Sequence, residues 1–243
     1  MKVCGVILVL CTSLGISKTV LAHREDYIDE TLVYVTLEKG ETEPEYFVDF
    51  GRKPDKSEEA NPGSKENFIR HSIALEHGIT DQWMIDGRIT LDDPEHERAK
   101  FDSGRFETRY RFFEEGEKPV DTAVSLEINT ERDEKGHLKT GIEPRLILSK
   151  DFGQLNFTLN LPVEVKFDSG NTAFIPSFGV RDNVNGLLRL GSELRYNTDN
   201  HEGSIIPQIW FALPREITIK LGYSFGFDRN EEDFARIAVE VAI

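Results

Sequence analysis

Hydrophobic and polar residues alternate strictly along much of this chain. In residues 155–167 every odd-numbered residue is apolar, and every even-numbered residue except Pro162 is polar. A period of two places the two kinds of side chain on opposite faces of a β-strand. This run of 13 residues is longer than the usual globular strand. It is long enough for a tilted strand that crosses a membrane, which needs about 9–11 residues.

The same alternation recurs at intervals through residues 43–243. Ten further segments carry it, at residues 69–75, 83–91, 106–112, 120–128, 142–148, 174–180, 188–196, 205–211, 217–225 and 237–243. Residues 43–50 give a twelfth strand, and an even number is typical of bacterial single-chain barrels. The pattern therefore predicts an all-β fold, a closed antiparallel transmembrane up-and-down β-barrel of about 12 strands over residues 43–243.

The predicted connections differ at the two ends of this barrel. With the N-terminus on the periplasmic side, inner turns should be short and outer loops longer. The predicted inner turns are tight and rich in Gly, Pro, Asp or Asn; they lie at residues 78–81, 114–118, 151–153, 182–186 and 213–215. The predicted outer loops include residues 51–66, 92–104, 131–137 and 197–203. Residues 167–172 form a shorter outer loop than this scheme expects.

A soluble β-sandwich, such as a periplasmic binding module, would also show alternation. However, strands of ten to thirteen residues are long for a sandwich. The polar faces also carry more charge than a solvated face requires. Both observations favour the barrel.

Residues 1–22 have the features of a secretory signal peptide. Lys2 precedes an apolar run over residues 3–14, and Ala22 provides a small residue for cleavage. The run is shorter than the roughly 20 residues of a transmembrane helix. Because Cys4 and Cys11 both lie within it, the mature chain is expected to have no disulfide and no thiolate metal site. Residues 23–42 are expected to form an N-terminal periplasmic segment before the barrel.

Removal of this signal leaves 27 Lys and Arg residues against 44 Asp and Glu residues, a net charge of −17. Such an acidic chain is not expected to bind nucleic acid, because the phosphate backbone demands a basic surface. The charge suits a protein that stays soluble in the periplasm before it inserts into the outer membrane. The expected partners are outer-membrane lipid, lipopolysaccharide and a small-molecule solute.

The residues between the apolar positions should face the lumen, and they are strongly charged. The candidate lumen-lining residues are Arg88, Glu107, Arg109, Arg111, Glu143, Arg145, Glu164, Lys166, Arg189, Glu193 and Arg195. Side chains fill a barrel of about eight strands, whereas sixteen or more leave an aqueous channel, so about twelve predict a constricted pore. Two arrangements remain open. The charges pair across the barrel and plug it, or they segregate onto facing walls of a water-filled channel.

The hairpin at residues 74–88, Ala-Leu-Glu-His-Gly-Ile-Thr-Asp-Gln-Trp-Met-Ile-Asp-Gly-Arg, resembles one family. This is the outer-membrane transporter family linked to the meta-pathway of phenol degradation. The strand rhythm over residues 67–243 is also similar. The resemblance implies an outer-membrane location and passage of small, apolar compounds. The chain departs from the common barrel pattern by ending in Ile243 rather than an aromatic residue.

Catalytic and cofactor motifs are weak in this sequence. His71 and Ser72 are adjacent and would point to opposite faces of a strand, which disfavours a catalytic pair. His96 and His201 lie in acidic loops that lack EF-hand spacing. The sequence therefore predicts a non-enzymatic channel or transporter without a metal or cofactor. The alternatives are a structural or surface-interaction barrel with a plugged lumen, the soluble sandwich, and a membrane-embedded hydrolase.

Overall fold

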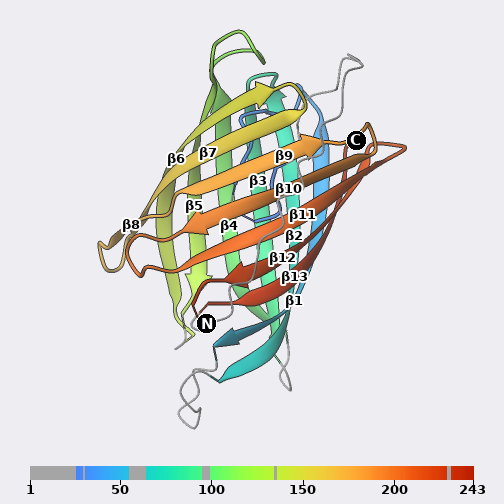
Figure 1. Ribbon diagram of the computed structural model, residues 1–243. Helices are drawn as coiled ribbons and strands as arrows, with labels where there is room; N and C mark the ends of the chain where they lie inside the picture. The colour runs from blue at the N-terminus through green and yellow to red at the C-terminus, as the bar shows by residue number, and fades with distance from the viewer. Residues whose placement is uncertain (1–25, 30, 55–63, 95–98, 134–135, 229–230) are drawn as a thin grey trace, which may run out of the picture.

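The computed structural model describes residues 26–29, 31–54, 64–94, 99–133, 136–228 and 231–243. These residues form 13 β-strands (Figure 1). The strands are β1 (Thr42–Pro54), β2 (Lys65–Thr80), β3 (Trp83–Pro94), β4 (Lys100–Arg111), β5 (Asp121–Arg132), β6 (Leu138–Phe152), β7 (Leu155–Lys166), β8 (Thr172–Phe174), β9 (Ser177–Asn183), β10 (Leu188–Tyr196), β11 (Gly203–Leu213), β12 (Ile217–Gly226) and β13 (Asp233–Val241). Within these ranges no helix is long and apolar enough to cross a membrane.

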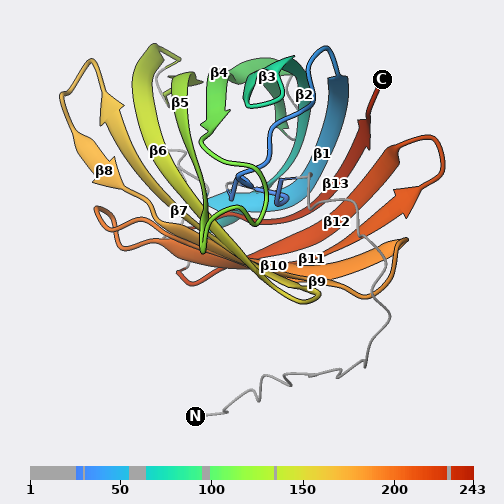
Figure 2. The ribbon, with the colours of Figure 1, turned by 90° about the horizontal axis from the view of Figure 1, so that it is seen from above.

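All the strands belong to one sheet that closes on itself. Successive strands are neighbours except that β8 and β9 both pair with β7, and β1 pairs with β13 to close the ring. Every pairing is antiparallel. The view from above shows the resulting ring of strands (Figure 2).

Strands β8 and β9 together occupy one strand position in the barrel. Both pair with β7, β8 near its end and β9 along its first half. Strand pairing is interrupted between them at Ile175 and Pro176, because proline has no N–H group to donate to a neighbouring strand. The 13 strands therefore fill 12 strand positions in the barrel, which confirms the predicted fold.

The two faces of the barrel differ as the alternation predicts. On β7, Leu155 is 38% exposed and Val163 is 36% exposed, whereas Asn160 is fully buried. Large apolar side chains are likewise exposed on the outside of the other strands. One closed sheet with an apolar exterior is not a β-sandwich, so that alternative is wrong. The apolar band is the surface that a bilayer covers, and the protein is an outer-membrane β-barrel.

The described residues of the N-terminal segment lie inside this barrel (Figure 2). The sequence predicts a periplasmic segment over residues 23–42. The segment's buried residues, each at most 7% exposed, are Tyr27, Ile28, Thr31, Leu32, Val33, Tyr34, Val35, Thr36 and Leu37. Most are apolar, and burial in the lumen removes their side chains from water.

Candidate functional site

The lumen is the candidate functional site, and residues 26–29 and 31–41, here called the plug, occupy part of it. The plug enters at the end where most connections between strands have two to four residues. There Gly40 N donates to Gly78 O at 2.8 Å, and Thr36 Oγ1 donates to Asp81 O at 2.8 Å. Further along, Tyr27 N donates to Thr31 O at 3.0 Å, so the plug turns back on itself within the barrel.

Polar side chains of the wall bind the main chain of the plug. The Glu193 carboxylate on β10 accepts a hydrogen bond from Thr31 N at 2.6 Å. The Gln208 side chain on β11 accepts one from Ile28 N at 2.8 Å. These wall residues satisfy backbone groups that would otherwise be buried without partners.

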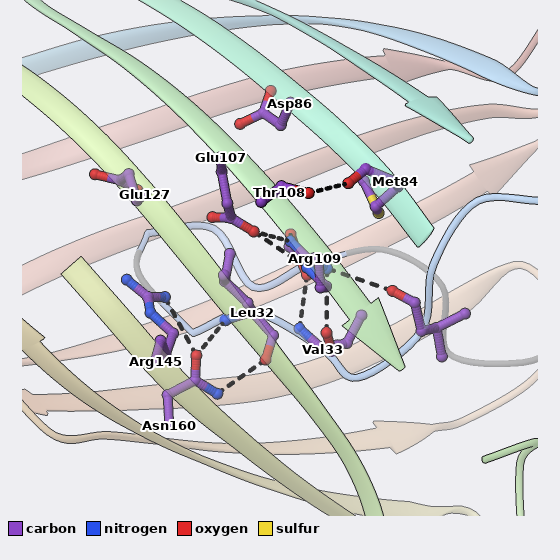
Figure 3. A network of polar contacts seen from close by, with 12 residues as sticks. Leu32, Val33, Met84, Asp86, Glu107, Thr108, Arg109, Glu127, Arg145 and Asn160 are labelled. Carbon is purple, nitrogen blue, oxygen red and sulfur yellow. Dashed lines mark hydrogen bonds and ion pairs between the residues drawn. The ribbon is translucent and has the colours of Figure 1, made fainter. Parts of the chain in front are cut away.

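Arg109 on β4 is a centre of these contacts (Figure 3). Its guanidinium donates to Asp26 at 2.7 and 3.0 Å, to Val33 O at 3.1 Å and to Glu107 at 3.2 Å. Burial alone would raise the pKa of the Asp26 carboxyl. The positive charges of Arg109 and Lys220, with the hydrogen bonds from Arg109 and Val33 N, outweigh burial and lower that pKa. Asp26 therefore stays ionised and anchors the start of the plug.

Asn160 on β7 forms a second centre (Figure 3). It contacts Leu32 of the plug, and its Oδ1 also accepts from Arg145 at 3.2 Å. Arg145 in turn binds Glu143 at 2.5 Å on the same strand. A wall ion pair and the plug therefore share one hydrogen-bonded group.

A row of acidic residues runs around one half of the inner wall. Six of them lie directly opposite one another on β1–β6: Glu43, Glu76, Asp86, Glu107, Glu127 and Glu143. Carboxylates opposite each other on neighbouring strands repel. Arginines on both sides of the row offset this repulsion; Arg105, for example, lies 3.4 Å from Asp86 and 3.7 Å from Glu127.

Beyond the plug, the lumen opens into a cavity of about 1000 Å³, here called the vestibule. It lies at the end of the barrel with the longer connections, and Asp29 of the plug contributes to its lining. Charged residues of both signs line its wall, including Lys53, Arg70, Asp92, Arg105, Glu127, Arg195 and Glu232. The vestibule can therefore hold a hydrated polar or charged solute, while the plug occupies the lumen next to it.

The residues proposed from sequence to line the lumen lie in several environments. Glu107, Arg109, Glu143, Arg145, Glu164 and Glu193 are at most 9% exposed. Arg88, Arg111, Lys166, Arg189 and Arg195 are intermediate. The structure brings some of them together in pairs, which are Glu107 with Arg109, Glu143 with Arg145 and Glu164 with Lys166. Others have different partners: Arg88 contacts Glu45, Arg111 contacts Glu114, and Arg195 contacts Asp29.

Sequence reasoning missed the uncharged and apolar residues that receive the plug. Asn160 and Gln208 bind its main chain, and Trp210 packs edge-on against Tyr27 with ring centroids 5.7 Å apart. A signal was available, because Ile206 and Trp210 both lie on the inward face of β11 and are buried there. A large apolar side chain facing a polar lumen indicates that something apolar lies against it.

No protein-family model matches the chain, and no curated protein matches its sequence. Solved structures share its fold. The KdgM porin superposes with a TM-score of 0.60 at 7% identity, over 82% of this chain and 98% of the porin. An outer-membrane channel from Pseudomonas putida F1 gives 0.59 at 12% identity, over 90% and 100%. Outer membrane phospholipase A from Escherichia coli gives 0.51 at 11%, over 82% and 92%.

One of these neighbours is an enzyme, and the adjacent residues His71 and Ser72 of this chain lie on β2. His71 Nδ1 lies 2.7 Å from the Tyr46 hydroxyl, whereas Ser72 Oγ lies 2.9 Å from Thr90 Oγ1. His71 and Ser72 therefore have separate partners. Among the described residues, no group of His, Cys, Asp and Glu side chains could hold a metal ion. His96 lies outside those residues.

Proposed function

We propose that this protein is an outer-membrane channel for small hydrophilic molecules and that the plug closes it. The observation that carries this proposal is the plug itself, held in the lumen by wall side chains beside a vestibule of about 1000 Å³. A solute that enters the vestibule can pass the barrel only when the plug moves. Transport is therefore gated by the N-terminal segment.

The direction of movement follows from the connections. Short turns of outer-membrane barrels face the periplasm and longer loops face outward. The vestibule then opens outward. The plug joins β1 at Thr42, at the short-turn end, so it withdraws toward the periplasm.

The charged vestibule favours hydrophilic solutes. One porin of similar fold was solved in complex with oligogalacturonate, an observation that belongs to that porin. The hairpin at residues 74–88 resembles transporters linked to phenol degradation, which implies smaller apolar compounds. Charged groups such as Arg70 and Asp92 support the hydrophilic class for this chain, because binding an apolar solute there would desolvate them without replacement.

A second candidate is a structural barrel whose lumen stays plugged. The many buried contacts of the plug favour it, Arg109 alone making hydrogen bonds to Asp26, Val33 and Val35. Conductance in planar bilayers separates the two functions. We expect low, intermittent conductance from the wild-type protein and larger, sustained conductance after removal of residues 23–40. A correctly folded barrel that conducts in neither form would be a structural barrel and would contradict the channel.

A further inference from the structure

We infer that the lumen is a binding site for a short peptide that turns back on itself, and that the plug is its tethered, exchangeable ligand. This inference goes beyond the proposed channel. It concerns binding alone and holds whether or not a solute crosses the barrel.

The wall recognises the plug mainly through main-chain groups. Six strands contribute one such side chain each: Arg109, Asn160, Glu193, Gln208, Lys220 and Arg236. Between them they accept from plug N–H groups and donate to plug carbonyl groups. Every peptide carries these groups, so another peptide that adopts the same turn could make the same hydrogen bonds.

Side-chain pockets add specificity. Tyr27 is 3% exposed, and its ring lies against Gly179, where a Cβ atom would be 2.3 Å from the ring. Trp210 packs against it edge-on, and the Arg181 guanidinium lies 5.4 Å from its ring centroid. Glycine on β9 therefore leaves a pocket shaped for an aromatic side chain.

The residues on either side of Tyr27 are also recognised. Asp26 forms an ion pair with Arg109 at 2.7 Å. Ile28 lies against Gly222, where a Cβ atom would come within 3.1 Å of it. The ligand class is therefore a peptide with an acidic, an aromatic and an aliphatic residue in succession, then a polar turn, and then a run of apolar residues.

The covalent link to the plug is accessible. Lys39 and Gly40 are exposed in the turn that joins the plug to β1, and a Cβ at Gly40 would meet nothing within 4 Å. A specific protease site can be inserted between these two residues of the full chain. The protein then folds with its plug in place, and cleavage afterwards turns the plug into a non-covalent ligand.

The test adds a fluorescent synthetic peptide of residues 26–37 to the cleaved barrel in detergent and follows its anisotropy. We expect saturable binding to the cleaved protein and much weaker binding to the uncleaved protein. In the uncleaved protein, tethering keeps the plug at an effective concentration that reaches the millimolar range for short linkers.

Matched variants test the site itself. N-methylation of the peptide at Leu32 removes its N–H donor to Asn160 and should weaken binding about tenfold. The barrel variant Gly179→Ala should weaken it by about as much or more, because it fills the Tyr27 pocket. Gly87→Ala is the control, since a Cβ there meets nothing within 4 Å.

Absence of peptide binding to the cleaved barrel would overturn the inference, as would equal binding of a scrambled peptide. If Gly179→Ala fails to fold, the N-methylated peptide still decides the question without any change in the protein. A cleaved barrel that conducts ions but binds no peptide would keep the channel and reject the peptide site. A cleaved barrel that binds peptide without conducting ions would keep the peptide site and reject the channel.

Discussion

Asn160 on β7 and Leu32 in the plug are 128 residues apart in the sequence, yet they exchange two hydrogen bonds, each of 2.9 Å. Asn160 Nδ2 donates to Leu32 O, and Asn160 Oδ1 accepts from Leu32 N. A carboxamide carries a donor and an acceptor side by side, so it pairs with a peptide unit as a neighbouring strand would. The contact joins the barrel wall to its occupant at a fully buried site.

We predict that Asn160→Leu lowers the free energy of unfolding by about 2–4 kcal/mol. The substitution leaves the N–H and C=O groups of Leu32 buried without these partners, and each such group costs about 1–3 kcal/mol. Urea unfolding in detergent, followed by the gel shift between folded and unfolded barrel, measures the change. Asn129→Leu at the vestibule is the matched control. Equal losses of unfolding free energy in the two variants would mean that the hydrogen bonds between Asn160 and Leu32 do not account for the loss.

The lipid face gives a second prediction. Leu159→Arg places a charge near the middle of β7, on the apolar outer face, and should destabilise the barrel by about 2–4 kcal/mol in lipid. Phe167→Arg, just beyond the end of the same strand, should cost about 0–1 kcal/mol, because an interfacial charge stays hydrated. Unfolding of both variants from lipid vesicles tests this dependence on depth. A similar cost at both positions would contradict the assigned membrane position of β7.

The strands were predictable because the barrel wall has two chemically different faces. Each strand separates lipid from lumen, so its sequence must alternate along its whole length, as residues 155–167 do. The break at Ile175 and Pro176 was not predicted, since the apolar residues Phe174 and Phe178 keep the same spacing across it. Alternation reports which face a side chain takes and says little about pairing interrupted by a proline.

The contents of the lumen were not predicted for a related reason. The plug is covered on every side, so Leu32, Val33 and Tyr34 are all buried and show no alternation. The wall carried a signal, in the large apolar residues Ile147 on β6 and Trp210 on β11 that face the lumen. Glu107, Arg109, Glu143 and Arg145 are among the candidate lumen-lining residues of the sequence, and the structure pairs Glu107 with Arg109 and Glu143 with Arg145. The hydrogen bonds of Arg109 to the plug depend on closure of the barrel, which no local pattern in the sequence records.

The acidic row makes a third prediction, that two neighbouring carboxylates respond in opposite ways to neutralisation. Asp86 lies opposite Glu76 and Glu107, and neither of its carboxylate oxygens makes a hydrogen bond. Asp86→Asn removes this repulsion together with the ion pair to Arg105 at 3.4 Å, and the net effect should leave stability unchanged or raise it by about 1 kcal/mol. Glu107→Gln weakens the bond to Arg109 and should cost about 1–3 kcal/mol. The urea assay compares the two variants, and a larger loss for Asp86→Asn would contradict this description of the row.

The last prediction concerns Arg109, which binds both the plug and the wall. Arg109→Ala leaves Asp26 and Glu107 without the guanidinium that neutralises them, and breaking a buried ion pair costs about 3–5 kcal/mol. Part of this loss falls on the docked plug, so the fraction of time that the lumen is open should rise. Glu107 then adds an unneutralised negative charge to the opened wall. We therefore expect higher conductance in planar bilayers and a reversal potential shifted toward cations.

Arg111→Ala is the control, because Arg111 pairs with the exposed Glu114 at the short-turn end and makes no described hydrogen bond to the plug. It should conduct like the wild type. A double variant, Asp26→Ala with Arg109→Ala, separates the loss of stability from the rise in conductance. It should keep the raised conductance and regain part of the lost stability. If Arg109→Ala matched the wild type in conductance, selectivity and melting, then this residue would not hold the plug, and gating by the N-terminal segment would lose its main support.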